Sequence, residues 1–156
     1  YGFRLFNAYG SAESNNREKT LEAVAYMEKS LSLRKEIVES GRATMKDSRN
    51  LADQYLMTGI PILASGKTAT AIENFRRSRE MFQTILFADL QNVEASRDMA
   101  NALYWLGVGL TQDGKKAEAR EQFLAAQKIV QNLLSREHTK EDSDLLKGIE
   151  DKMKLL

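Results

Sequence analysis

The stretch RDMANALYWLGVGLTQDGKKAEAREQFLAAQKIVQNLL, residues 97–134, decides the fold because it repeats an earlier part of the chain. It aligns without a gap on residues 49–86, which lie 48 positions before it. Chance matching would give roughly two or three identities over such a window. Eleven of the aligned positions are identical: Arg49/Arg97, Ala52/Ala100, Gly59/Gly107, Gly66/Gly114, Lys67/Lys115, Ala69/Ala117, Ala71/Ala119, Glu73/Glu121, Phe75/Phe123, Gln83/Gln131 and Leu86/Leu134. The chain is therefore built from repeated units.

The same period reaches toward both ends of the chain. Five N-terminal residues stand 48 positions before an identical one: Lys19, Thr20, Ala23, Ser30 and Ile37. At the other end, Asp144-Leu145 echoes Asp98-Met99 at a spacing of 46, which indicates the start of an unfinished unit. We therefore predict one domain over residues 1–156, with units at about 1–41, 42–89 and 90–137 and a final helix.

Apolar spacing predicts two helices in each unit. Met99, Leu103, Leu106 and Leu110 recur at spacings of four, three and four, as on one face of a helix. Gly114 interrupts the pattern at the expected helix end. Applied along the chain, this reasoning predicts helices over roughly 2–14, 17–40, 44–64, 67–88, 91–112, 115–135 and 141–155. The segments Thr44–Asp47 and Thr139–Asp142 resemble capping boxes, with aspartate at the fourth position.

The composition agrees with a helical domain and excludes several kinds of site. The 156 residues include one proline, 42% hydrophobic residues and 29% charged residues, with a net charge of +1. So few prolines favour long helices. The chain has no cysteine and a single histidine, which excludes disulfides, thiolate nucleophiles and sites that need two imidazoles. Because the first residue is Tyr1 rather than methionine, the chain is compatible with a segment of a longer protein.

The residues of the repeated units resemble the tetratricopeptide repeat. The third unit follows its spacing with Leu103, Leu106-Gly107, Leu110, Gly114, Ala119, Phe123 and Ala126. The resemblance implies an all-α, right-handed α-α superhelix of three helical hairpins, closed by a capping helix over about 141–155. Thr58 departs from the usual leucine, no proline closes a unit, and the period exceeds the usual 34 residues by 14. The longer units resemble arrays linked to bacterial serine/threonine kinases.

No residue pattern points to catalysis. His138 lies in a polar segment between predicted helices, and Gly66-Lys67-Thr68 lacks the first glycine of a phosphate-binding loop. Arg76, Arg77 and Arg79 cluster, but the net charge of +1 leaves no broad basic face for nucleic acid. We expect a cytoplasmic protein that is not an enzyme, with no cofactor, no metal site, no nucleic-acid partner and no membrane span.

The resemblance places a partner-binding surface on the first helices of units two and three, along the concave side. The residues expected there include a tryptophan and a tyrosine, which are enriched in binding hot spots. They are Asp53, Leu56, Met57, Ile60, Leu63, Asn101, Tyr104, Trp105, Val108, Thr111 and Gln112. Of the asparagine and lysine clamp that some family members use for a peptide carboxylate, only Asn101 fits. The expected function is a protein–protein interaction scaffold that holds a helix or an extended peptide.

The sequence is also compatible with two different placements of these apolar residues. Trp105 and Met57 can pack inside the stack or against the final helix, since an aromatic residue at helical spacing is more often core. Alternatively, the apolar surface is covered in a homodimer, with the array serving as a dimerising or regulatory module of a larger signalling protein.

Overall fold

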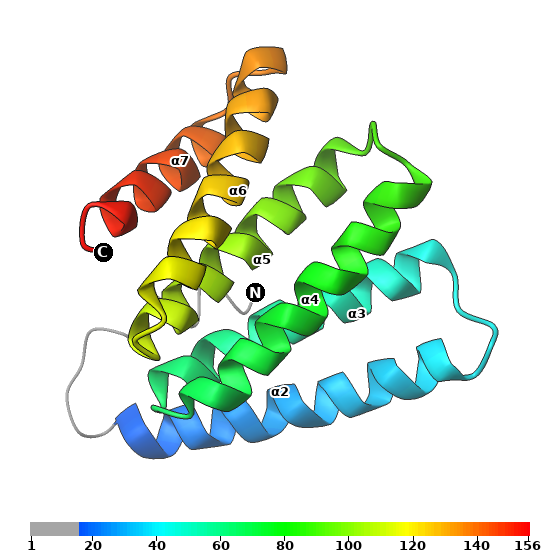
Figure 1. The fold of residues 1–156 in the computed structure, drawn as a ribbon. Coiled ribbons are helices and arrows are strands. Elements are labelled where there is room, and N and C mark those ends of the chain that lie inside the picture. The colour runs from blue at the N-terminus through cyan, green and yellow to red at the C-terminus, as the bar shows by residue number, and fades with distance from the viewer. Residues whose placement is uncertain (1–15) are drawn as a thin grey trace.

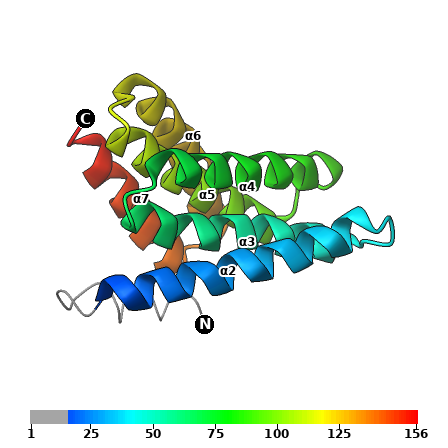
Figure 2. The ribbon, with the colours of Figure 1, turned by 90° about the horizontal axis from the view of Figure 1, so that it is seen from below.

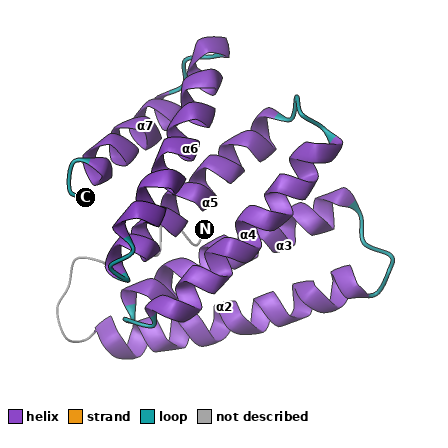
Figure 3. Ribbon diagram, in the orientation of Figure 1, coloured by secondary structure: helices purple, strands orange, loops and turns teal. Residues whose placement is uncertain are grey.

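The computed structural model describes residues 16–156, and this part of the chain consists of helices joined by loops, without strands (Figures 1 and 3). Its helices are α2 (Asn16–Glu39), α3 (Met45–Ala64), α4 (Thr68–Ala88), α5 (Val93–Gln112), α6 (Lys116–Arg136) and α7 (Lys140–Met153). Every helix predicted in this range is confirmed, with bounds that differ by at most two residues. The helix predicted over 2–14 lies outside the described residues.

The 48-residue repeat is confirmed as a repeat of structure. Both bounds of α3 and α4 reappear 48 positions later as the bounds of α5 and α6. The turn inside each hairpin is also the same: Gly66 and Gly114 have φ of 83° and 79°, in the region that favours glycine. The backbone N–H of the next lysine then donates back into the first helix, from Lys67 to Ile62 and from Lys115 to Leu110.

Consecutive helices pack against one another from α2 to α7 (Figures 1 and 2). The helices α3 and α4 form one hairpin and α5 and α6 the next, while α7 lies on the last hairpin. In addition, α5 contacts both α3 and α7. The helices α3, α5 and α7 are therefore neighbours along one side of the molecule, and we call them the inner helices.

A glycine and a phenylalanine make the closest contact in each hairpin. A methyl group added at Gly59 would lie 2.8 Å from Cδ1 of Phe75, and one at Gly107 would lie 2.7–2.9 Å from three ring atoms of Phe123. Both rings are fully buried. Since the two pairs are related by the repeat, the same close approach joins α3 to α4 and α5 to α6. Phe75 and Phe123 are thus buried between the two helices of their hairpins.

One large core connects all the hairpins. It begins at Val24 on α2, includes both phenylalanines and ends at Ile149 on α7. A glycine also lets neighbouring hairpins approach: a methyl group at Gly109 of α5 would lie 3.0 Å from Cγ1 of Ile72 on α4. A smaller cluster around Phe82 fills the space between the far end of α4 and the helices α3 and α5.

The two predicted capping boxes lie at the N-termini of α3 and α7. At α3 the box is complete: the Thr44 hydroxyl accepts from the Asp47 N–H at 3.2 Å, and the Asp47 carboxylate accepts from the Thr44 N–H at 2.8 Å. At α7 only half of it forms. Thr139 caps the helix, but the Asp142 carboxylate accepts instead from the Thr139 hydroxyl and from Arg97. The charge of Arg97 explains why the aspartate turns toward it.

Glycine-to-alanine substitutions test the close approach in the hairpins. Alanine favours a helix by about 1 kcal/mol over glycine, but at Gly107 its methyl group would collide with the Phe123 ring. We expect Gly107→Ala to lower the free energy of unfolding by about 1–3 kcal/mol, measured by urea denaturation. Gly148→Ala is the control, because its methyl group would lie 3.7 Å from Tyr104 and should be neutral or stabilising. Equal effects of the two variants would contradict the predicted collision.

Ser78 offers a test in the opposite direction. It is fully buried on α4 and its hydroxyl has no hydrogen-bond partner among the described residues, whereas its repeat equivalent is Ala126. Because an unpaired buried hydroxyl costs about 1–3 kcal/mol, we expect Ser78→Ala to raise the melting temperature. The control is Ser30→Ala, which removes a hydroxyl that donates to Gln54 at 3.2 Å. A destabilised Ser78→Ala protein would show that the hydroxyl is paired.

Candidate functional site

The predicted partner-binding residues separate into a surface group and a core group. Leu56, Ile60 and Leu63 are only 3–5% exposed and belong to the main core. This corrects their expected place in a surface lining, and the reason is that α3 is packed against α2, α4 and α5 at once. The other eight residues are half-buried or exposed, and we call them the inner face: Asp53, Met57, Asn101, Tyr104, Trp105, Val108, Thr111 and Gln112.

The apolar part of the inner face is anchored on the core while still reaching solvent. Met57, Tyr104, Trp105 and Val108 are partly buried and pack against the main core cluster. Trp105 stacks on the buried Phe75 ring, with centroids 6.3 Å apart, and meets Tyr104 edge-on at 5.5 Å. Trp105 is therefore both core-packed and partly exposed, so its side chain is held in one orientation.

Tyr104 connects the inner face to the last helix. Its ring lies 6.0 Å from that of Phe123, and its hydroxyl is near Gly148 of α7. Burial raises the pKa of the Tyr104 phenol. Together with the Phe75–Trp105 stack, this gives a continuous row of aromatic rings from α4 through α5 to α6, beside α7. The row supports the apolar part of the inner face along its length.

The polar members of the inner face differ in what they offer a partner. Asn101 and Thr111 donate to backbone carbonyls one turn earlier, of Arg97 at 3.1 Å and Gly107 at 2.8 Å. Their side-chain oxygens keep acceptor capacity for a partner. Asp53 and Gln112 are exposed, and neither makes a side-chain hydrogen bond or ion pair with another described residue. The inner face thus presents a negative charge on α3 and an uncharged amide at the end of α5.

Two arginines related by the repeat tie the inner helices together. Arg49 of α3 donates from Nε to Asp98 of α5 at 2.9 Å and also pairs with Glu94. Arg97 of α5 holds Asp142 of α7 through two hydrogen bonds, at 2.7 and 2.9 Å. Neither arginine was predicted to have this role. The available signal was the repeat itself: Glu94 and Asp142 each stand 45 positions after the arginine they pair with, so these two acidic partners occupy equivalent positions.

The pKa values of the carboxylates on the inner helices shift in opposite directions. The hydrogen bond from Arg97 holds the pKa of Asp142 below its ordinary value. Burial raises the pKa of Asp98, against the opposing influence of Arg49. Partial desolvation and the neighbouring charge of Asp98 raise the pKa of Asp53. These shifts follow from the contacts between helices, and the ion pairs hold the inner helices in register.

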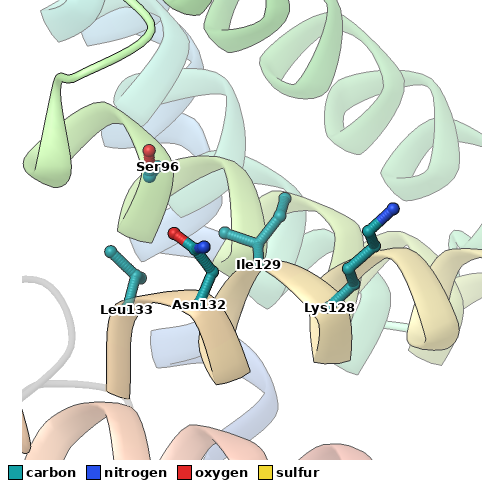
Figure 4. A pocket seen from close by; sticks show the side chains of 5 residues that line it. All are labelled: Ser96, Lys128, Ile129, Asn132 and Leu133. Atoms are coloured by element: carbon teal, nitrogen blue, oxygen red, sulfur yellow. The ribbon is translucent and has the colours of Figure 1, made fainter. Parts of the chain in front are cut away.

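Beyond the inner face, the described residues form a pocket but no cluster of metal ligands and no membrane-spanning helix. An open pocket lies between α5 and α6, lined by Ser96 from α5 and by Lys128, Ile129, Asn132 and Leu133 from α6 (Figure 4). The Ser96 hydroxyl already donates to the backbone of Asn92 at 2.9 Å. Within residues 16–156, no three or more potential acidic or imidazole ligands gather as a metal site, and no helix has the length and apolarity needed to cross a membrane.

Comparisons with protein-family models, curated proteins and solved structures find no match for this chain. We therefore infer function from the inner face itself.

The Arg97–Asp142 tie gives a prediction with a pH dependence. The side chain of Asp142 is 1% exposed and that of Arg97 is 19% exposed, and removing one partner of a buried pair costs about 3–5 kcal/mol. We expect Asp142→Asn to destabilise the protein by that amount at pH 7. Because the folded pKa of Asp142 is below its ordinary value of 3.8, its stabilisation is complete above that value and is lost as the pH falls through the folded pKa.

The gap in melting temperature between the wild type and Asp142→Asn should therefore shrink below about pH 4. Asp98→Asn is the control. Its carboxylate pairs with an arginine that is 37% exposed, and burial disfavours its charge, so we expect a loss of less than about 1 kcal/mol. A larger effect for Asp98→Asn than for Asp142→Asn would contradict this ranking of the two ties.

Proposed function

We propose that the protein is a non-catalytic interaction scaffold that binds a peptide or a helix on its inner face. The proposal includes the right-handed superhelical arrangement that the tetratricopeptide resemblance implies. The repeat of two equivalent hairpins supports that arrangement, because such units stack side by side and present their first helices on a common surface. The inner helices α3, α5 and α7 supply that surface.

The observation that carries the proposal is the partly exposed aromatic and apolar set at Met57, Tyr104, Trp105 and Val108. Tryptophan and tyrosine contribute most to binding when they are preorganised by their neighbours. Here Trp105 is held by Phe75 and Tyr104, so little side-chain freedom is lost when a partner arrives. Asp53 and Gln112 of the same face supply polar contacts.

Trp105 is the only tryptophan of the chain, so its fluorescence reports directly on the inner face. We expect peptides selected from a random library on the immobilised protein to shift the Trp105 emission in a saturable way. Met57→Glu places a charge in the apolar part of the face and should weaken the binding of the selected peptides at least tenfold, about 1.4 kcal/mol. Fluorescence titration with each purified variant measures this change.

The matched control is Leu124→Glu, which introduces the same charge at a side chain of α6 that is 48% exposed. It should leave peptide affinity and emission unchanged, while circular dichroism shows both variants folded. Selected peptides that bind without changing Trp105 emission, or that bind Met57→Glu as well as the wild type, would show that another surface is used. Either result would overturn the proposed function.

A further inference from the structure

The helix α2 has an apolar row that the described chain does not cover. It packs on α3 through Val24 and Leu31, which are 4% and 8% exposed. On its other side, Tyr26, Leu33 and Ile37 are 68%, 53% and 51% exposed. At 3.6 residues per turn these three positions lie within about 40° of one another around the helix. They therefore form one narrow strip, which we call the α2 strip.

The opposite end of the stack is different. On α7 the large apolar residues Leu145, Leu146 and Met153 are packed against the core, and Ile149 is fully buried. The side chains that α7 leaves exposed are charged. Exposed apolar strips of this kind mark contact sites, so the two ends of the stack have different roles. Among residues 16–156, the α7 end closes the core, whereas the α2 end leaves an apolar strip uncovered.

We propose that the α2 strip pairs with the α2 strip of a second copy of the chain, in an antiparallel dimer. The charges beside the strip identify this occupant. Lys29 and Glu36 are both exposed, lie on the same flank of the strip, and form no ion pair with another described side chain. A two-fold axis that relates antiparallel helices brings the same flank of both copies together. Lys29 of each copy then faces Glu36 of the other.

The apolar residues place the two-fold axis at nearly the same position along α2 as the charged residues do. The midpoint of Lys29 and Glu36 lies between Ser32 and Leu33. The midpoint of Tyr26 and Ile37 lies only one residue away, so Tyr26 packs near Ile37 of the second copy. Leu33 packs against its own counterpart at the axis. One axis therefore satisfies two reciprocal ion pairs and the whole apolar strip, which makes the surface self-complementary.

The size of the contact sets the expected strength. A helix of 24 residues is about 36 Å long, and one such helix pair buries less than the roughly 1,200 Å² of a stable interface. The dimer should therefore be reversible, with a dissociation constant in the micromolar range or weaker. The α2 strip is a different surface from the inner face, so the dimer does not depend on the proposed function.

Sedimentation equilibrium over about 1 µM to 1 mM chain tests the dimer. We expect a concentration-dependent rise from monomer to dimer for the wild type. Lys29→Glu and Glu36→Lys should each weaken dimerisation about tenfold, since two attractive pairs become repulsive. The double variant Lys29→Glu/Glu36→Lys should restore it, and an equimolar mixture of the two single variants should form a heterodimer. Only a reciprocal contact predicts that rescue.

Leu33→Glu should abolish dimerisation, because it buries two like charges at the axis, while Leu124→Glu on α6 should leave it unchanged. Both side chains are about half exposed, and circular dichroism checks that both variants remain folded. A wild type that stays monomeric at the highest concentration would overturn the proposal. A dimer that Leu33→Glu does not affect, or that the double charge reversal does not restore, would assign the contact to another surface and overturn it as well.

Discussion

In each hairpin, a glycine of the first helix lies against a phenylalanine ring of the second helix. This close contact sets the distance between the two helices. At Gly59–Phe75 and Gly107–Phe123 there is no room for even one methyl group. The ring fills the gap that the missing side chain leaves, so the two helices approach closely without leaving a cavity. Since the contact recurs after 48 residues, both hairpins have the same geometry and can stack in the same way.

Stacking then produces the surface on which function is proposed. Phe75 and Phe123 each support an aromatic residue of α5, Trp105 and Tyr104 respectively. The contact that closes each hairpin therefore also orients the partly exposed aromatic side chains of the inner face. The arginine ties from α3 to α5 and from α5 to α7 hold the inner helices in place relative to one another. The core packing and the ion pairs therefore both hold the inner face in place.

The fold was more predictable from sequence than the site was. Glycine, phenylalanine and turn positions recur at a constant spacing, so helix bounds and buried rings followed from the repeat. The site depends on which side of a helix is covered, and that is decided by neighbours far away in the chain. Leu56 and Ile60 were expected at the surface because the tetratricopeptide resemblance places them on the concave side, whereas α3 packs against α2, α4 and α5. Glu94 and Asp142 each lie 45 residues after the arginine they pair with, but an alignment of repeats does not show which side chains meet across two helices.

The most direct test of the hairpin contact is the measurement of nuclear Overhauser effects between glycine Hα protons and phenylalanine ring protons in isotope-labelled protein. We expect strong effects from Gly59 to the Phe75 ring and from Gly107 to the Phe123 ring, of similar size because the two hairpins are equivalent. Gly148, whose nearest aromatic atoms are farther away, should give a weaker effect to Tyr104. Assigned spectra without the Gly107–Phe123 effect would contradict the claim that this contact closes the hairpin.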